Sequence, residues 1–400
     1  SEVPYNLDEI YAGMLKQDGD VYKIAVLAQK PEDVIRVLRL QEAARRPTMA
    51  FCMGDIGQPS RFLALKYGAP WIYAAFNKER GIAPGMPSFD DFRTTYAGKT
   101  IARDTRFFGV VGDPVDHSFS PLLHNHIYKQ LKVNAIYLPF RIPRGQLADA
   151  IDWYGYIPIH GYSVTIPHKE AAAVLAREKD HSVEVTGAAN TLVRRNDGKF
   201  TASNTDYSAA IDSLKAHLAE RAKDGPVVQL SQLSVLILGA GGVARAIAFG
   251  LHREGAQITI TGRTYDRAQR LAEEVKCKAV DWHARHAVNC DVLINCTPVG
   301  MHPNVDEAPC HFSIMKPGMT VFDTIYRPET TLLIREARTR GCHTVTGVDM
   351  FVRQAARQIE MFIGQNPDTA YMREILRKAL SPLTKAFETE ETAAAEKGNN

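Results

Sequence analysis

The stretch LSVLILGAGGVARAIAFGL, residues 233–251, decides the fold of the chain's second half. An apolar run leads into a glycine-rich turn and then into a segment with the apolar spacing of a helix. Gly239 permits the tight turn, Gly241 lets the backbone approach a pyrophosphate, and Ala244 lets the helix pack on the strand. Free N–H groups at the helix start would face the anion. The stretch predicts a dinucleotide site, although an unliganded glycine turn is the alternative. The contacts expected there are Gly239, Ala240, Gly241, Gly242, Val243 and Ala244.

The next predicted strand, AQITIT at 256–261, indicates which dinucleotide is bound. NAD-specific sites usually place a carboxylate at this strand end, to hold the ribose hydroxyls. Here Arg263, Thr264 and Arg267 follow the strand. Two guanidinium groups and a hydroxyl suit a 2′-phosphate, so NADP is favoured over NAD. A solvated helix face is the alternative for the two arginines.

Bulk composition narrows the class of protein. The chain has 400 residues, 45% hydrophobic and 23% charged, and a formal net charge of +3. This length predicts two or three domains, and the balanced charge favours neither nucleic acid nor a membrane as partner. The six cysteines form no CxxC pair, which is typical of reduced thiols in a cytoplasmic protein. We expect no metal. The chain opens at Ser1 without a methionine, as a fragment would.

Residues 5–96 alternate strand-like runs with helical stretches. The predicted strands are 22–28, 48–53 and 71–76. Short connections between such units predict parallel β/α architecture, but three units are too few to close an eight-stranded barrel. The polar stretch 97–105 reads as a linker.

Two further β/α series follow. The first has predicted strands at 106–112, 134–140, 161–166 and 189–195. The second begins at 233, after the separating segment 223–232. The charged, alanine-rich tail after Pro382 is predicted to be disordered.

The segment GYSVTIPHKE, 161–170, places a possible reactive group at a strand end. A β-branched run stops at Pro167 and is followed at once by His168 and Lys169. Taken alone, this pattern fits a buried strand with a solvated exit better than it fits catalysis.

Several segments together, in order, resemble the shikimate dehydrogenase family over roughly residues 106–380. They are GVVGDPVDHSFSPLLHN (109–125), GYSVTIPHK (161–169), GAANTL (187–192), SNTD (203–206), GAGGVAR (239–245), GRTYDR (262–267), NCTPVGM (295–301), DTIYRPETTLL (323–333) and GVDMFVRQA (347–355). The resemblance implies a two-domain α/β fold with a Rossmann-like NADP domain. It also implies NADP-dependent, reversible reduction of 3-dehydroshikimate to shikimate in aromatic amino acid biosynthesis.

The resemblance makes Lys169 the catalytic lysine, paired with Asp206. A cationic donor stabilises the charge that builds on a ketone oxygen during hydride transfer and supplies a proton. A neighbouring carboxylate would hold the ammonium, so the two groups would titrate as one unit. A structural salt bridge is the alternative interpretation.

The same resemblance implies roles for further residues. Hydroxyl, amide and phenol groups that can donate and accept suit a carboxylate with ring hydroxyls. The implied substrate contacts are Ser118, Ser120, Thr165, Asn190, Tyr326 and Gln354. Those implied for the nicotinamide end of the cofactor are Thr297, Met301 and Gly347. Helix capping would also explain the serines, and core packing would explain Met301.

Three positions depart from the family pattern, namely Ser203, Ala209 and Gly262, and none of them removes a catalytic atom. Two other functions remain open. One is a sensor that keeps the pocket without turnover, which intact Lys169 and Asp206 disfavour. The other is an NAD-linked quinate dehydrogenase, which Arg263 and Arg267 disfavour.

Residues 5–96 resemble the C-terminal part of type I 3-dehydroquinate dehydratase, as fused in bifunctional enzymes. Lys23 matches the Schiff-base lysine and Arg61 the arginine that clamps the substrate carboxylate. A strand-end charge is the alternative for Lys23. No histidine precedes His117, and Ile82 and Met86 replace the serine and glutamine that hold substrate. We therefore expect no dehydratase activity from residues 1–400 alone.

The expected domain boundaries follow from these resemblances. They are a partial (β/α)8 barrel at 1–98, a substrate-binding catalytic domain at 104–208, a Rossmann NADP domain at 209–351, returning helices at 352–383 and a disordered tail at 384–400.

Overall fold

The computed structural model describes residues 2–77, 83–116, 118–222 and 227–381. The chain forms two compact units. The first contains residues 1–203 with 358–367, and the second contains residues 204–357 with 368–400. The predictions for Ile82, His117 and the tail after Pro382 lie outside the described residues.

The first unit begins with a two-stranded parallel sheet, β1 (Tyr22–Leu27) and β2 (Thr48–Met53), as predicted. Its helices are α1 (Leu7–Met14), α2 (Pro31–Ala43), α3 (Gln58–Lys66) and α4 (Phe89–Arg93). Helix α2 starts where Asp33 accepts hydrogen bonds from the backbone N–H of Gln29 and Lys30, with Pro31 in the first turn. Its apolar face is fully buried.

The strand predicted at 71–76 is wrong. Only a single bridge forms there, between Ala75 and Ser88. The backbone N–H of Ala75 donates to the Pro87 carbonyl over 2.9 Å, and the Phe89 N–H donates to the Ala75 carbonyl over 2.7 Å. The segment satisfies its backbone groups with the turn before α4, so it does not extend the sheet beyond β2.

A six-stranded sheet forms the rest of the first unit, in the order β4-β3-β5-β7-β8-β6. Its strands are β3 (Arg106–Gly112), β4 (Ala135–Arg141), β5 (Ile159–Val164), β6 (Glu178–Lys179), β7 (Thr191–Arg194) and β8 (Phe200–Ser203). Strands β4, β3 and β5 are parallel, and β7 is antiparallel to both of its neighbours. The helices of this part are α5 (Ser120–Gln130), α6 (Leu147–Tyr154), α7 (Lys169–Leu175) and α8 (His181–Thr186).

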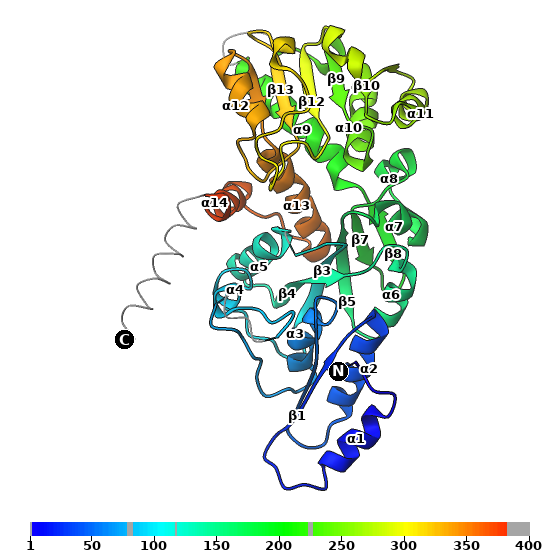
Figure 1. The fold of residues 1–400 in the computed structure, drawn as a ribbon, viewed down its shortest axis with the longest axis vertical. Helices are drawn as coiled ribbons and strands as arrows, with labels where there is room; N and C mark the ends of the chain where they lie inside the picture. The colour runs from blue at the N-terminus through cyan, green and yellow to red at the C-terminus, as the bar shows by residue number, and fades with distance from the viewer. Residues whose placement is uncertain (1, 78–82, 117, 223–226, 382–400) are drawn as a thin grey trace, which may run out of the picture. The chain divides into compact units, whose positions relative to one another are not determined.

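The second unit is built on a fully parallel sheet in the order β11-β10-β9-β12-β13-β14. Figure 1 labels four of these strands, β10, β9, β12 and β13. The strands of the sheet are β9 (Ser234–Leu238), β10 (Gln257–Thr261), β11 (Lys278–Val280), β12 (Val292–Asn295), β13 (Thr320–Asp323) and β14 (His343–Val345). Numbered along the chain, this is the order 3-2-1-4-5-6 of a dinucleotide-binding fold. Its helices are α9 (Thr205–Arg221), α10 (Gly242–Arg253), α11 (Tyr265–Val275), α12 (Leu332–Thr339), α13 (Gly347–Ile363) and α14 (Thr369–Leu380).

Helices cover both faces of this parallel sheet. Val235 and Ile237 belong to the hydrophobic cluster under α9, α10 and α11, whereas Leu236 and Leu238 belong to the cluster under α12. Alternate residues of β9 therefore point into two different cores. This is why the strand reads as a continuous apolar run.

Among the described residues, no helix has the length and apolarity that a membrane crossing needs. All six cysteines are free thiols.

Candidate active site

The predicted substrate residues of the first unit lie where its parallel strands end. The loop after β3 carries Ser118 and Ser120, and the loop after β5 carries Thr165 and Lys169. Backbone hydrogen bonds join the two loops, because the Asp113 N–H donates to the Ile166 carbonyl over 3.0 Å and the Thr165 N–H donates to the Val111 carbonyl over 3.0 Å. The carboxyl edge of adjacent parallel strands is the usual ligand site of an α/β sheet.

Lys169 and Asn190 also lie at this edge, although they are far apart in the sequence. Lys169 is the first residue of α7, and its carbonyl accepts a 2.8 Å hydrogen bond from the Ala189 N–H. The next residue, Asn190, is buried, and its carbonyl accepts from the Val164 N–H over 2.7 Å. The backbone thus brings Thr165, Lys169 and Asn190 together at this edge.

His168, unlike the adjacent Lys169, is a buried structural residue. It is 1% exposed, and its Nε2 donates a 2.7 Å hydrogen bond to the Ile142 carbonyl. A buried, backbone-bonded imidazole ties α7 to the end of β4. Of the two groups at this strand end, the histidine is therefore structural, and Lys169 stays the predicted catalytic group.

The two serines begin α5. Ser120 is the first helical residue and is buried, and its backbone N–H donates to Ser118 Oγ over 3.2 Å. Ser118 therefore bonds the helix start from one residue before the N-cap, which is Phe119 and makes no side-chain capping bond. A hydroxyl that accepts from the helix start keeps its proton for another acceptor, so this hydrogen bond is compatible with a role at a carboxylate.

His124 and Asn125, which complete the serine motif, are structural. The Asn125 side chain accepts from the Tyr137 N–H (2.8 Å) and donates to the Tyr137 carbonyl (2.9 Å), which satisfies the outer edge of strand β4. His124 stacks on Tyr137 with 4.0 Å between ring centroids, and burial lowers its pKa to about 3. The histidine is therefore neutral packing.

The sequence analysis missed Ser163 and Gln358. Gln358 is buried and accepts from Ser163 Oγ over 2.7 Å. It also donates to the Asn190 carbonyl (3.0 Å) and to Thr191 Oγ1 (3.1 Å), and Thr191 Oγ1 in turn donates to Asn190 Oδ1 over 2.8 Å. The network fixes the Asn190 side chain. Its signal was present, because Gln358 lies four residues after Gln354 and hence on the same helix face.

In the second unit, the glycine turn lies at the topological switch point between β9 and β12. Gly239 has a φ of +114°, and a Cβ there would lie 3.0 Å from the Cys296 carbonyl oxygen and 3.4 Å from the Thr297 side chain. A larger residue would be strained and would collide with the loop after β12. A Cβ on Gly241 would meet nothing within 4 Å, so the space above the turn can receive a pyrophosphate.

The predicted phosphate-binding residues lie beside this turn. A Cβ on Gly262 would be 3.7 Å from the Ala240 Cβ, which places the end of β10 against the glycine loop. Arg263, Thr264 and Arg267 are all exposed. Within the described residues, neither arginine forms an ion pair. Both guanidinium groups are thus available to a phosphate.

The loop after β12 is held by a side-chain network. Thr297 donates from both its backbone N–H (2.9 Å) and its hydroxyl (2.7 Å) to Asn295 Oδ1. The amide nitrogen of Asn295 then donates to Asp323 Oδ1 over 3.1 Å. Met301, further along this loop, is 46% exposed, which contradicts its interpretation as core packing and leaves it available as a contact.

Asp323, at the end of β13, is the centre of this network and was missed as such. It is fully buried, and it also accepts from the Ile325 N–H (3.1 Å) and from Thr331 Oγ1 (2.6 Å). Burial raises its pKa to about 6, against the opposing effect of these hydrogen bonds. One carboxylate therefore fixes both the loop of Thr297 and the loop that carries Tyr326.

The remaining predicted residues of the second unit lie around α13. The rings of Tyr326 and Phe351 are 4.4 Å apart, and burial raises the pKa of the tyrosine. Gln354 is buried, and its amide donates to the Phe351 carbonyl over 3.1 Å. A Cβ on Gly347 would lie 2.3 Å from the Ile325 carbonyl oxygen, so only glycine fits there. Tyr326 and Gly347 thus lie in adjoining segments.

Asp206 lies in the first turn of α9 and is 8% exposed. It belongs to the second unit, and Lys169 to the first. Their pairing therefore stays a prediction.

Of the predicted dehydratase residues, Lys23 lies on strand β1 and Arg61 lies in helix α3. Lys23 is exposed, and its Nζ lies 4.3 Å from the centroid of the Tyr73 ring. Arg61 is 2% exposed, over the ring of Phe51 at 4.4 Å, and burial lowers its pKa to about 10. Its Nε and Nη1 have no hydrogen-bond partner among the described residues.

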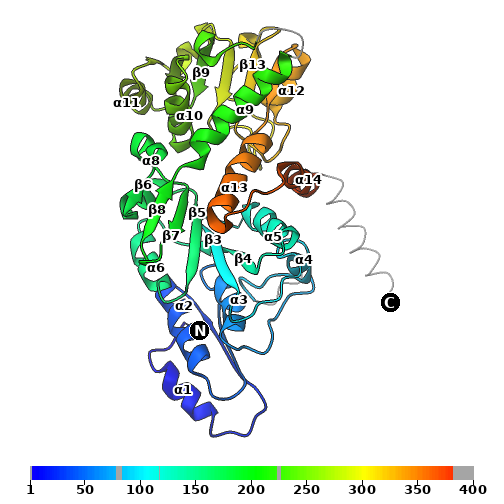
Figure 2. The ribbon, with the colours of Figure 1, turned by 180° about the vertical axis from the view of Figure 1, so that it is seen from behind.

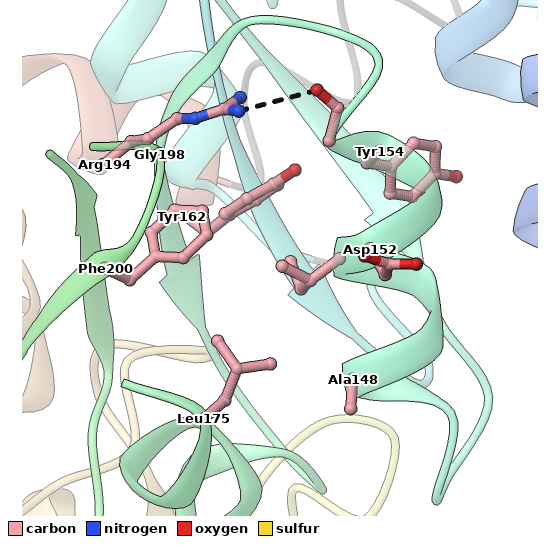
Figure 3. Close-up of a pocket in the computed structure, with 10 residues that line it drawn as sticks. Ala148, Asp152, Tyr154, Tyr162, Leu175, Arg194, Gly198 and Phe200 are labelled. Carbon is pink, nitrogen blue, oxygen red and sulfur yellow. Dashed lines mark hydrogen bonds between the residues drawn. The ribbon is translucent and has the colours of Figure 1, made fainter. Parts of the chain in front are cut away.

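A pocket of about 360 Å³ lies elsewhere in the first unit, between α6 and the strands β5, β7 and β8 (Figure 3). Tyr162 and Phe200 form one wall, and the guanidinium of Arg194 donates to the carbonyls of Ile157 (3.1 Å) and Gly155 (3.5 Å). None of the predicted site residues lines it.

Together, the strand order, the glycine turn at the switch point and the polar carboxyl edge of the first sheet define the class of two-domain, dinucleotide-dependent dehydrogenases. Three domain families of shikimate dehydrogenases match successive parts of the chain. They are the substrate-binding domain (110–192), the shikimate/quinate 5-dehydrogenase domain (217–307) and the C-terminal domain (347–377). Residues 1–102 match type I 3-dehydroquinase.

Comparison with individual proteins gives the same family as the domain matches. The chain is 39% identical over 293 residues to the shikimate dehydrogenase (NADP(+)) of Methanopyrus kandleri, which covers 70% of this chain and 98% of that protein. It is 36% identical over 367 residues to the chloroplastic bifunctional 3-dehydroquinate dehydratase/shikimate dehydrogenase of Arabidopsis thaliana, covering 90% of this chain but only 60% of the relative. A Thermus thermophilus shikimate 5-dehydrogenase solved with NADP(H) and shikimate has a TM-score of 0.62 and 30% identity, over 69% of this chain and all of that one. The chain belongs to the shikimate dehydrogenase family.

Proposed function

We propose that this chain catalyses the reversible, NADP-dependent reduction of 3-dehydroshikimate to shikimate. The observation that carries the proposal is the grouping of Thr165, Lys169 and Asn190 at the carboxyl edge of the first sheet. The binding partners that we propose are small molecules, namely 3-dehydroshikimate, shikimate and NADP. The proposal is supported by the second unit, whose sheet order and glycine turn suit a dinucleotide.

Substrate recognition is proposed to use groups that both donate and accept. The hydroxyls of Ser118 and Ser120 suit the substrate carboxylate, because they bind it without burying a second full charge. Thr165 and Asn190 suit ring hydroxyls, and the Gln358 network holds the amide of Asn190 in one orientation. Buried polar groups of this kind reject an analogue that lacks a hydroxyl, since they would be left unpaired. Tyr326 and Gln354 are proposed as further substrate contacts.

The proposed proton transfer uses Lys169. When bound, the reduced nicotinamide supplies the hydride that the carbonyl carbon accepts. Negative charge then develops on the carbonyl oxygen, and the Lys169 ammonium stabilises it by a charge-assisted hydrogen bond and gives up a proton. Asp206 is proposed as the acidic partner in this proton transfer. In the direction of shikimate oxidation, the two groups take the hydroxyl proton instead.

The residues present fit NADP. The open space above Gly241 can take the pyrophosphate, and Arg263, Thr264 and Arg267 can hold the 2′-phosphate. The exposed Met301 and the loop of Thr297 are proposed to contact the nicotinamide end, together with Gly347.

The test is shikimate oxidation by the purified chain, followed as NADPH absorbance. General acid–base groups contribute about 10²- to 10⁴-fold, so Lys169→Ala should lower kcat by about 10³-fold. Lys179→Ala is the matched control, because Lys179 is an exposed lysine of the same unit. If Lys169 and Asp206 act together in proton transfer, the variant with both residues replaced by alanine will be no less active than the less active of the two single variants. A wild-type chain that binds shikimate without turnover would instead support the sensor function, and faster turnover of quinate with NAD would support a quinate dehydrogenase.

For residues 1–98 we propose no dehydratase activity in this chain. Imine chemistry needs an amine enclosed together with its substrate, whereas Lys23 is exposed on a two-stranded sheet and its Nζ lies over the Tyr73 ring. Borohydride treatment in the presence of 3-dehydroquinate should therefore leave the mass of the chain unchanged. A covalent adduct on Lys23, or measurable dehydration, would refute this.

A further inference from the structure

The dehydratase-like segment, residues 1–98, shares a hydrophobic core with the substrate-binding sheet. One cluster of buried residues runs without a break from Leu7 in α1 to Ala202 in β8. Helix α2 packs on α6 and helix α3 packs on β4, as Figure 1 shows for the blue part of the chain. A segment without a core of its own cannot move independently of the sheet on which it packs.

Polar contacts extend from this segment to the loop that carries the two serines. Arg141 is the last residue of β4, and its guanidinium forms two ion pairs. Its Nη1 is 2.6 Å from Oδ2 of Asp55, which lies just after β2, and its Nε is 2.9 Å from Oδ1 of Asp113, which lies just after β3. Asp113 opens the loop that leads to Ser118.

A second set of contacts reaches the helix that begins at Ser120. The segment after α4 lies along α5, as both Figure 1 and Figure 2 show. Asn125 Nδ2 donates to the Thr95 carbonyl (3.2 Å), His126 Nε2 to the Thr94 carbonyl (2.6 Å) and Lys129 Nζ to the Ala97 carbonyl (3.0 Å). Three side chains from two adjacent turns therefore fix the axis of α5 against the dehydratase-like segment.

We propose that residues 1–98 are a positioning element for substrate binding, in which Asp55, through Arg141, holds the loop after β3 in the geometry that binds the substrate carboxylate. The inference rests on the proposed function and deepens it. Asp55 and Arg141 touch no substrate. They act by restricting Asp113, and through it Ser118 and Ser120.

The expected size of the effect follows from exposure. The side chains of Arg141, Asp55 and Asp113 are 38%, 44% and 25% exposed, so solvent screens the pairs. Partly exposed ion pairs are worth up to about 1 kcal/mol, which corresponds to about a fivefold change in an equilibrium constant. The Arg141 guanidinium binds Asp55 after β2 and Asp113 after β3, so it limits the motion of both of these loops. It does so because a planar guanidinium fixes the direction of its hydrogen bonds as well as their length.

The test compares Asp55→Asn with a matched control, Glu42→Gln, in the full chain. Glu42 accepts from the Tyr156 hydroxyl, so its variant also weakens a contact of the dehydratase-like segment, but on the side of α2 and α6. For Asp55→Asn we expect KM for shikimate to rise about two- to fivefold, with kcat and KM for NADP+ unchanged. Glu42→Gln should leave all three constants unchanged. Arg141→Ala, which removes both pairs, should raise KM for shikimate further, and Arg141→Lys should fall between it and wild type.

Three outcomes would overturn the inference. These are an unchanged KM in Asp55→Asn, an equal rise in Glu42→Gln, or a fall in kcat that matches the rise in KM. Calorimetric titration with shikimate separates this inference from the proposed function. A wild-type chain that binds shikimate without oxidising it refutes the function alone, and the affinities of the variants then decide the inference.

Discussion

Replacing Asp323 by asparagine should change how the stability of the second unit depends on pH. The carboxylate is fully buried, and its burial raises its pKa to about 6. An unfolded aspartate has a pKa of about 3.9, so the difference is worth about 3 kcal/mol. Asparagine has nearly the same shape and does not titrate, so it removes this contribution.

The sign follows from proton linkage. Because the pKa of this acid is raised in the folded state, the folded chain keeps its proton at pH values where the unfolded chain has lost it. The contribution of Asp323 to the free energy of unfolding is therefore largest well below pH 4 and falls by about 3 kcal/mol in total as the pH rises through both pKa values. Above about pH 7 it is constant. Because an unfolded aspartate is already about half ionised at pH 4, the free energy of unfolding of Asp323→Asn minus that of wild type should rise by about 2 kcal/mol between pH 4 and pH 7.

Hydrogen bonds lost in the variant change its free energy of unfolding by the same amount at every pH. The change of the variant-minus-wild-type difference with pH therefore reports only the titration of Asp323. The chain has three tryptophans, and Trp282 packs on the core of the second unit. In a background with Trp71→Phe and Trp153→Phe, urea unfolding followed by Trp282 fluorescence reports on that unit. Measurements at pH 4, 5, 6 and 7 complete the assay. The reasoning would be refuted if the free energy of unfolding of the variant minus that of wild type stayed constant with pH to within about 1 kcal/mol. A fall of this difference with rising pH would refute it as well.

Three further changes test other parts of the structure. Arg263→Ala with Arg267→Ala should raise KM for NADPH by about 10-fold or more and leave KM for NADH almost unchanged, because each lost charge-assisted bond costs about 1.5–3 kcal/mol; equal effects on both cofactors would contradict the phosphate role. Gly347→Ala should destabilise the second unit by about 2–3 kcal/mol, since the added methyl would meet a backbone carbonyl at 2.3 Å; an unchanged melting temperature would show that the contact relaxes freely. Arg61→Met should raise the free energy of unfolding by about 1–3 kcal/mol, because it removes a buried charge without full hydrogen bonding and keeps the aliphatic stem. A loss of stability would mean that its contact with an aromatic ring outweighs that burial.

Most elements could be predicted from the sequence because their signals are local. The apolar runs at 106–112 and 233–239 became β3 and β9, and Gly239 marked the turn because its positive φ depends on the chain within a few residues. The run at 71–76 failed because a strand needs a neighbour. Its backbone found partners near Ser88 instead, and no local pattern encodes that choice.

For the site, the sequence by itself determined which chemical groups are present and in what order: a lysine after a β-branched run, serines before a helix, arginines after a strand. Only the tertiary structure decided which of them are available. It buried His168 against the Ile142 carbonyl and left Lys169 at the head of α7, and it joined Asp55 to Asp113 through Arg141. It also placed Asp323 where the loops after β12 and β13 meet. The physical reason is that local sequence sets backbone conformation, whereas burial, ion pairing and pKa depend on groups far along the chain that meet only after folding.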